Sequence, residues 1–322
     1  MIGERSPGGT DRGVDELRFE AMGTFAHVIV VGGVPGAADQ VRRRVDDLEA
    51  KWSRFRHTSE LSILNAHAGE LVRVSAETRL LLQRGIEGWH LTGGAFDPTV
   101  LGAVLRAGYD RTFAELDPRS AGGHSLLELG CEGILIEGDR ARLPDGTGFD
   151  SGGIGKGLAA DLASIEAIEA GAGGVCVNLG GDIRVRGAGA GGDGAGWTVG
   201  IEHPGRTGPL ALLGLADGAV ATSTTLKRTW LADGERRHHL IDPRSGLPAD
   251  GGMALATVVD GEGWRAEVLA KAVLLNGGPR PFDILGGTGA EGIAVDREGG
   301  VVGSEGLARF LGGVELPGRI GP

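Results

Sequence analysis

The order of its strand-like and helical segments is the feature that most constrains the fold of this chain. Alternating or short apolar segments predict a hairpin over residues 133–143 and strands at residues 17–31 (interrupted at 22–24), 175–179, 182–186, 197–202, 219–222, 237–241, 254–259 and 292–296. Apolar residues at helical spacing and glycine-rich stops predict helices over 37–55, 75–91, 157–169 and 264–275. Because the strands gather in the middle and do not alternate regularly with helices, we predict an α+β fold. Its central sheet is expected to be mostly antiparallel and flanked by helices, unlike a doubly wound sheet.

The chain of 322 residues is long enough for one large domain or two small ones. Signs of an internal boundary are weak, so we assign residues 17–315 to a single domain. Residues 1–16 are polar and rich in glycine, which predicts a disordered N-terminal tail. Glycine is abundant, at 62 residues, and the glycine-rich run 187–196 predicts a flexible loop.

The net charge of −11 argues against binding of nucleic acid independently of sequence, because no broad basic face remains to attract phosphates. No apolar run is long enough to cross a membrane, and the first residues contain no hydrophobic signal core. The two cysteines, Cys131 and Cys176, lie in apolar surroundings, which favours buried thiols over a disulfide. These features predict a cytoplasmic protein without a membrane span.

The strongest local signal is the glycine-rich segment 149–161, in which Asp150 ends a strand and Lys156 arrives as a helix begins. Backbone N–H groups at the start of a helix favour a phosphate, and a lysine adds a positive charge. The alternative is a tight turn with a solvated lysine, and the segment alone does not decide between them. It is not a P-loop, because the required spacing of glycine, lysine and serine or threonine is missing.

Two further glycine-rich corners follow the predicted helices and strands. The segment 93–100 holds Phe96 and Asp97 on a turn fixed by glycines and a proline, which fits a binding site or a plain helix-capping turn. The segment 178–182 fits close approach of a ligand to the backbone, although a hairpin with a type I′ or II′ turn is slightly favoured.

A third cluster combines hydroxyls, cations and two histidines in the segments 221–228 and 238–246. Hydroxyl and cationic side chains at a strand end suit phosphate oxygens. His239 is a candidate general base. The alternative is that His238 and His239 face opposite sides of one strand, one exposed and the other packed.

Taken in this order, the segments resemble the ApbE family of FAD:protein FMN transferases. The resemblance covers nearly the whole folded chain, and seven matching stretches in order are hard to obtain by chance. The matching stretches are Met22 to Thr24, Phe55 with Ser59 to Asn65, Gly94 to Thr99, Asp150 to Asp161, Asn178 to Asp182, Thr222 with Ser223, and His239 to Gly246.

The resemblance implies an enzyme that binds FAD in a cleft, with Mg²⁺ near the pyrophosphate. It implies transfer of FMN, as a phosphoester, to an exposed Ser or Thr of an acceptor protein, with release of AMP. The residues it assigns to FAD are Met22, Phe55, Ala95, Phe96, Asp97, Asp150, Lys156, Ser223 and Ile241. It assigns a metal-binding carbonyl to Gly153 and a catalytic role to His239.

The last predicted helix departs from the family at two positions. Where the family has the pattern Ala-Asp-x-x-x-Thr, this chain has Glu267 in place of the Asp and Lys271 in place of the Thr. Glu267 still offers oxygens to Mg²⁺, whereas the Lys271 ammonium would repel a divalent cation or take over part of its charge at the pyrophosphate. Glu267 and Lys271 are also spaced for a simple surface ion pair on one helical face. We therefore expect either altered metal dependence, with Lys271 acting in catalysis, or lost transfer with FAD binding retained.

Three functions stay open on the sequence. The first is the FMN transferase, the second a non-catalytic FAD-binding protein, and the third an FAD pyrophosphatase that uses water and releases FMN and AMP. A dinucleotide-dependent dehydrogenase is disfavoured, because no strand–Gly-x-Gly-x-x-Gly–helix unit is present. The sequence leaves open the acceptor protein, the preferred metal and whether the protein is a monomer or a dimer.

Overall fold

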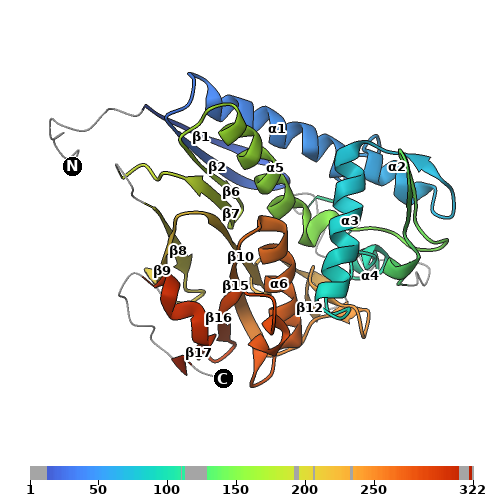
Figure 1. Ribbon diagram of the computed structural model, residues 1–322. Helices are drawn as coiled ribbons and strands as arrows, with labels where there is room; N and C mark the ends of the chain where they lie inside the picture. The colour runs from blue at the N-terminus through green and yellow to red at the C-terminus, as the bar shows by residue number, and fades with distance from the viewer. Residues whose placement is uncertain are drawn as a thin grey trace, which may run out of the picture.

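A nine-stranded sheet forms the centre of the computed structural model, which describes residues 13–109, 111–112, 129–191, 196–205, 207–232, 235–311 and 319–320 (Figure 1). In spatial order the strands are β1 (Val14–Ala21), β2 (Thr24–Val31), β6 (Gly174–Leu179), β7 (Asp182–Gly187), β10 (Gly218–Thr224), β15 (Met253–Asp260), β16 (Glu291–Asp296), β17 (Val301–Gly303) and β18 (Arg319–Ile320). All neighbours pair antiparallel except β17 and β18. The predicted α+β fold with a mostly antiparallel sheet is confirmed.

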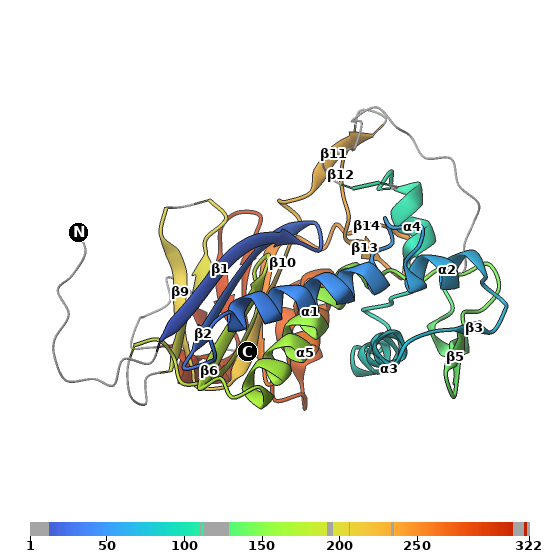
Figure 2. The ribbon, with the colours of Figure 1, turned by 90° about the horizontal axis from the view of Figure 1, so that it is seen from above.

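Helices cover one face of this sheet and a hairpin covers the other (Figures 1 and 2). On the helical face, α1 (Ala37–Trp52) and α5 (Gly155–Glu169) pack on the β1–β7 half, and α6 (Gly263–Asn276) packs on β10 and β15. On the other face, the hairpin of β8 (Trp197–Glu202) and β9 (Pro209–Leu215) shares a core with the sheet and the 3-10 helix η5 (Glu305–Phe310).

A set of shorter elements packs at the end of the helical layer, where Figure 2 shows them beyond α1. Sequence patterns predicted α3, the β4–β5 hairpin and a strand over 237–241 in this set, because the other elements are too short for a clear period. The set comprises α2 (Glu60–Ala66), β3 (Val72–Arg73), α3 (Ala76–Leu91), α4 (Leu101–Arg106), η2 (Cys131–Gly133), β4 (Leu135–Glu137), β5 (Arg140–Arg142), η3 (Ser151–Gly153), β11 (Thr229–Ala232), β12 (Glu235–His238), β13 (Ile241–Asp242) and β14 (Leu247–Pro248). The 3-10 helix η4 (Pro281–Leu285) packs instead against α6 and β16.

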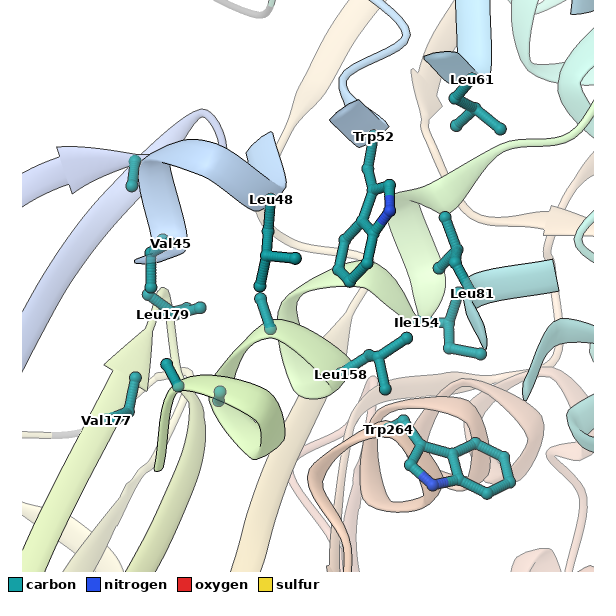
Figure 3. Close-up of a cluster of buried hydrophobic side chains, with 14 of the residues drawn as sticks. Val45, Leu48, Trp52, Leu61, Leu81, Ile154, Leu158, Val177, Leu179 and Trp264 are labelled. Atoms are coloured by element: carbon teal, nitrogen blue, oxygen red, sulfur yellow. The ribbon is translucent and has the colours of Figure 1, made fainter. Parts of the chain in front are cut away.

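The main core lies between α1, α5 and the sheet (Figure 3). Leu48 and Trp52 of α1 are almost completely buried and face α5, where Leu158 is equally buried. Trp264, at the start of α6, closes the same core from below in this view. Burying a large apolar side chain contributes about 1.5–3 kcal/mol, so this core fixes the start of α5 against the start of α6.

Glycine permits α5 and α6 to touch through their backbones. A Cβ atom at Gly157 would lie 2.8 Å from the backbone nitrogen of Trp264 and would overlap the carbonyl of Gly263. One turn further along α5, Asp161 accepts hydrogen bonds from the backbone N–H groups of Gly263 (2.8 Å) and Trp264 (3.0 Å). The Asp161 carboxylate satisfies two free backbone N–H donors at the N-terminus of α6. Arg184 forms an ion pair with the same carboxylate at 3.0 Å. The final acid of the segment 149–161 therefore holds two helices together.

Some predicted boundaries were wrong. Residues 14–16, which the sequence assigned to the tail, belong to β1 because each pairs with a residue of β2; residues 1–12 lie outside the described residues. The predicted strand 237–241 is divided between β12 and β13, since the chain bends after His238. The favoured hairpin turn at 178–182 is confirmed, as Gly180 (φ 67°) and Gly181 (φ 100°) both have positive φ. Within the described residues, no helix has the length and apolar character needed to span a bilayer.

Replacing Gly157 with alanine should separate α5 from α6. Because the added methyl group overlaps backbone that cannot rotate away, we expect Gly157→Ala to lower the free energy of unfolding by about 1–3 kcal/mol. The measurement is urea denaturation followed by circular dichroism. Gly155→Ala is the matched control, since a Cβ there meets only the Ser151 side chain at 3.3 Å. Equal unfolding midpoints for the two variants would contradict the tight contact.

Candidate functional site

The predicted site residues gather at one end of the sheet. The β1–β2 turn, the β6–β7 turn and the end of β10 lie at this end, as the pairing registers show. The start of α5 joins it through Lys156, which contacts Asp182 at the beginning of β7. The middle of α6 joins it through Glu267, which also contacts Lys156. Residues far apart in the sequence therefore form one polar cluster.

Lys156 is held between two buried carboxylates. Its ammonium donates to Asp182 and, at 2.8 Å, to Oε1 of Glu267. The other oxygen of Glu267 accepts the backbone N–H of Gly157 at 2.8 Å. Burial alone would lower the pKa of Lys156, but the charges of Asp182 and Glu267 outweigh it and raise that pKa. We call Lys156, Asp182 and Glu267 the buried triad; its lysine is charged but already neutralised by two acids.

This arrangement overturns one of the expectations for α6. Glu267 does not form a surface ion pair with Lys271, because it is 4% exposed and its oxygens contact Lys156 and Gly157. Lys271 lies one turn further along α6 and is partly exposed. Its Nζ lies 5.7 Å from the centroid of the Phe96 ring. No hydrogen bond or ion pair joins it to another residue in the part of the chain that the structure describes.

Lys271 also lies directly against Gly153 in η3. A Cβ atom at Gly153 would be 2.6 Å from Cε of Lys271 and 3.1 Å from the Phe96 ring, so a larger residue there would displace the end of the Lys271 side chain. Burial lowers the pKa of Lys271, and the nearby positive charge of Lys156 lowers it further, whereas Asp150 and Glu267 oppose the shift. Lys271 is thus a half-buried cation near acids that it does not contact.

The corner after α3 forms the wall behind Gly153. Gly93 (φ 57°) and Gly94 (φ 84°) turn the chain, and the Thr92 hydroxyl accepts the backbone N–H of Phe96 at 3.0 Å. Phe96 is 2% exposed. Asp97 accepts from the backbone N–H (2.7 Å) and hydroxyl (2.5 Å) of Thr99, and burial raises the pKa of its carboxyl. Ala95, between the glycines and Phe96, is partly exposed and can face a ligand.

A cluster of aromatic rings and one arginine borders the site near Asp150. The guanidinium of Arg54 lies over the rings of Phe55 (4.1 Å) and Tyr109 (4.5 Å), and its Nε is 3.4 Å from Asp150. Tyr109 stacks on Trp230 at 5.6 Å between ring centroids. Nη2 of Arg54 is buried with no hydrogen-bond partner in the described structure. The sequence predicted Phe55 and Asp150 but not these three partners, which no local motif marks.

His239 lies beside this cluster. Its ring meets Tyr109 edge-on at 6.2 Å, and its Nδ1 is buried without a hydrogen-bond partner among the described residues. Burial lowers the pKa of His239 well below its ordinary value, and the charges of Arg228 and Lys271 lower it further. The ring is therefore neutral at pH 7 and able to accept a proton. His238 is buried, and its Nε2 hydrogen-bonds to the Ala249 carbonyl at 3.0 Å. The alternative of one strand with one exposed and one packed histidine was wrong, because β12 ends at His238 and His239 is half-buried.

The remaining predicted residues lie in the β1–β2 turn, at the end of β10 and in β13. Met22 has a positive φ of 51°, uncommon for a residue with a side chain, in the β1–β2 turn. Arg228 donates to the carbonyl of the neighbouring Gly23 at 3.2 Å, which joins the segment after β10 to that turn. Ser223 is partly exposed at the end of β10, and Ile241 is buried near Tyr109 and Trp230.

A cavity of about 1190 Å³ lies elsewhere and includes none of the predicted site residues. It is lined by residues from α4, β12, β14 and the turn after β16, including His238 and Arg297. The chemistry described above therefore lies outside this cavity, at the end of the sheet. Size alone does not identify the functional site in this protein.

A divalent cation does not fit the predicted metal position. Glu267 already uses one oxygen for Lys156 and the other for Gly157, and the Lys271 side chain lies against Gly153. Within the described ranges, no group of three or more His, Cys, Asp or Glu side chains is arranged to hold a metal. An ammonium beside the position would repel Mg²⁺, which prefers several oxygen ligands.

Comparison with known proteins yields one consistent result. The family model described as "ApbE family" matches residues 22–306. A protein of Treponema pallidum named FAD:protein FMN transferase is 31% identical over 309 residues, covering 86% of this chain and 83% of its own. One of the same name from Vibrio cholerae is 29% identical over 283 residues, covering 82% of each. The crystal structure of the ApbE protein of Thermotoga maritima superposes with a TM-score of 0.83 at 28% identity, covering 93% of this chain and 99% of its own.

Removing the lysine of the buried triad should destabilise the fold. Lys156→Met leaves Asp182 and Glu267 buried side by side without a cation, and we expect it to cost roughly 3–5 kcal/mol of unfolding free energy. Lys51→Met is the control, because Lys51 pairs with Asp47 at 2.7 Å on the surface of α1 and should cost less than about 1 kcal/mol. Denaturant unfolding of both variants tests the difference. Similar losses would mean that the triad is not a structural unit.

Proposed function

The chain belongs to the ApbE family, and from this premise we propose that it transfers the FMN half of FAD to a Ser or Thr hydroxyl of an acceptor protein. The acceptor oxygen attacks the phosphorus on the flavin side of the pyrophosphate. The bond from this phosphorus to the bridging oxygen breaks, and AMP leaves with that oxygen. The product is a phosphoester between FMN and the acceptor. Relatives named FAD:protein FMN transferase, matched over most of their length, support this proposal.

The observation that carries the proposal is a neutral histidine between cations and an aromatic wall. Nδ1 of His239 has no hydrogen-bond partner among the described residues, and its lowered pKa keeps the ring unprotonated. A neutral imidazole can take the proton from the attacking hydroxyl. Bound pyrophosphate would offset the charges of Arg228 and Lys271 and so raise the pKa of His239 as the reaction begins.

The surrounding residues suit the parts of FAD. The pyrophosphate would lie near Arg228 and Lys271, where fixed cations stabilise the negative charge that builds on phosphorus oxygens during attack. Phe55 is exposed and offers an apolar surface to a flat ring, whereas Tyr109 is buried and supports it through contacts with Phe55, Arg54 and Trp230. Met22, Ala95, Phe96 and Ser223 are proposed to line the flavin and nucleoside parts. Asp97, Asp150, Lys156 and Ile241 would hold these residues in place.

Several finer expectations remain predictions. Mg²⁺ as a cofactor, a cytoplasmic location, and a monomeric or dimeric state come from the sequence alone. The poor fit of a divalent cation to Glu267 and Gly153 weakens the first of these. The acceptor is expected to be a protein with an exposed Ser or Thr, and nucleic acid is not expected as a partner.

The direct test uses the purified protein, FAD and an acceptor protein with an exposed Ser/Thr flavinylation sequence. We expect a covalently fluorescent acceptor band after denaturing electrophoresis, together with one AMP for each FMN attached. His239→Gln should lower the rate by about 10²–10⁴-fold, because it removes the base while leaving a side chain of similar size. FAD affinity should stay within a few-fold of the unchanged protein.

Two controls separate the alternatives. An acceptor with its target Ser or Thr changed to Ala must remain unlabelled. Free FMN and AMP with no labelled band, for several acceptors, would indicate a pyrophosphatase. FAD bound and left intact would indicate a non-catalytic FAD-binding protein, and either result would contradict the transferase.

The pH dependence should report the depressed pKa of His239. Since the base acts when unprotonated, a lowered pKa keeps it active to lower pH. We expect kcat/KM for FAD, which reflects the free enzyme, to stay level as the pH falls through 6.5 and to decline only below it. In His239→Gln, kcat/KM should no longer show this decline at acidic pH. An acidic limb centred at or above pH 6.5 would show that His239 is not held in the neutral form.

A further inference from the structure

The Lys271 ammonium is a half-buried cation that has no hydrogen-bond or ion-pair partner in the described structure. A charged group that loses part of its hydration without gaining an ion pair is costly, so such groups are usually paired. Lys156, in the same site, has two carboxylates within contact, whereas among the described residues Lys271 contacts the face of Phe96 at 5.7 Å. A cation–π contact at this distance compensates a small part of the lost hydration.

The neighbouring cations differ from Lys271 in their contacts. The charge of Lys156 is balanced by Asp182 and Glu267, and Arg228 donates to the Gly23 carbonyl. Arg54 lies 3.4 Å from Asp150 and donates to the Tyr109 carbonyl, although its Nη2 has no partner among the described residues. Lys271 brings a positive charge over Gly153 that no carboxylate in the described structure contacts.

The local structure keeps Lys271 in this position. Gly153 leaves room for its Cε, Phe96 stands on one side, and the buried triad fixes α6 one turn earlier, at Glu267. Its charge also reaches His239, whose pKa it helps to lower. The charge of Lys271 therefore acts at the proposed base.

We propose that Lys271 binds the pyrophosphate of FAD directly and supplies the positive charge for FMN transfer, so that this protein works without a divalent cation. The proposal rests on the proposed function. The ammonium stays protonated throughout and forms no covalent bond. The acceptor oxygen bonds to the flavin-side phosphorus, AMP leaves, the hydroxyl proton goes to His239, and Lys271 donates hydrogen bonds to the phosphate oxygens.

The first arm measures transfer by protein stripped of metal, in EDTA and in excess Mg²⁺. We expect the unchanged protein to label the acceptor at rates that agree within about twofold. Lys271→Met, similar in length but uncharged, should label it roughly 10²–10³-fold more slowly in both conditions. Lys271→Arg should retain part of the rate. Labelling by the unchanged protein that disappears in EDTA and returns with Mg²⁺ would overturn the proposal while leaving the proposed function intact.

The second arm measures binding and does not depend on transfer. FAD and inorganic pyrophosphate should bind Lys271→Met about 10–100-fold more weakly than the unchanged metal-free protein, whereas riboflavin should bind both equally. Both proteins should melt at similar temperatures, because Lys271 makes no ion pair in the described structure that the substitution would break. Equal affinity of both proteins for FAD would overturn the contact. If no acceptor is ever labelled, the proposed function fails, and this arm still decides whether Lys271 holds the pyrophosphate.

Discussion

The contact between Lys156 and the two buried acids holds this site together. It joins the start of α5, the start of β7 and the middle of α6, three elements more than twenty residues apart in sequence. A buried cation between two carboxylates is stable only when each charge is met, so each element fixes the position of the other two. The glycine contact between α5 and α6 and the cap supplied by Asp161 reinforce the same arrangement.

The triad divides the roles of the two lysines. Lys156 has a structural role, because Asp182 and Glu267 balance its charge within the protein. Lys271, one helical turn beyond Glu267, is left facing the site with its charge unbalanced by any direct contact in the described chain. A substitution that looks like the loss of a metal ligand in the sequence thus becomes, in three dimensions, the gain of a positive charge where a phosphate would bind.

Local sequence was sufficient for features that depend on local backbone. The glycines at 93–94 and 180–181 marked turns with positive φ, and the segment 149–161 marked the start of α5. The predicted strand end at Asp150 was wrong, because β5 ends at Arg142 and Asp150 directly precedes the 3-10 helix η3. Local sequence was insufficient for contacts between residues that are far apart along the chain. Nothing near Glu267 in sequence indicates Lys156, which is 111 residues away, and the i,i+4 spacing of Glu267 and Lys271 suggested the wrong pair. Arg54 and Tyr109 were missed for the same reason, since only the folded chain brings their side chains to Asp150 and His239.

The most direct measurement of this account is a crystal structure of the protein with FAD, grown in EDTA. The account predicts Nζ of Lys271 at a hydrogen-bond distance of about 2.7–3.2 Å from a pyrophosphate oxygen, with Lys156 still bound to Asp182 and Glu267. Pyrophosphate bound by Lys156, with the triad broken and Lys271 turned away from the phosphates, would contradict it.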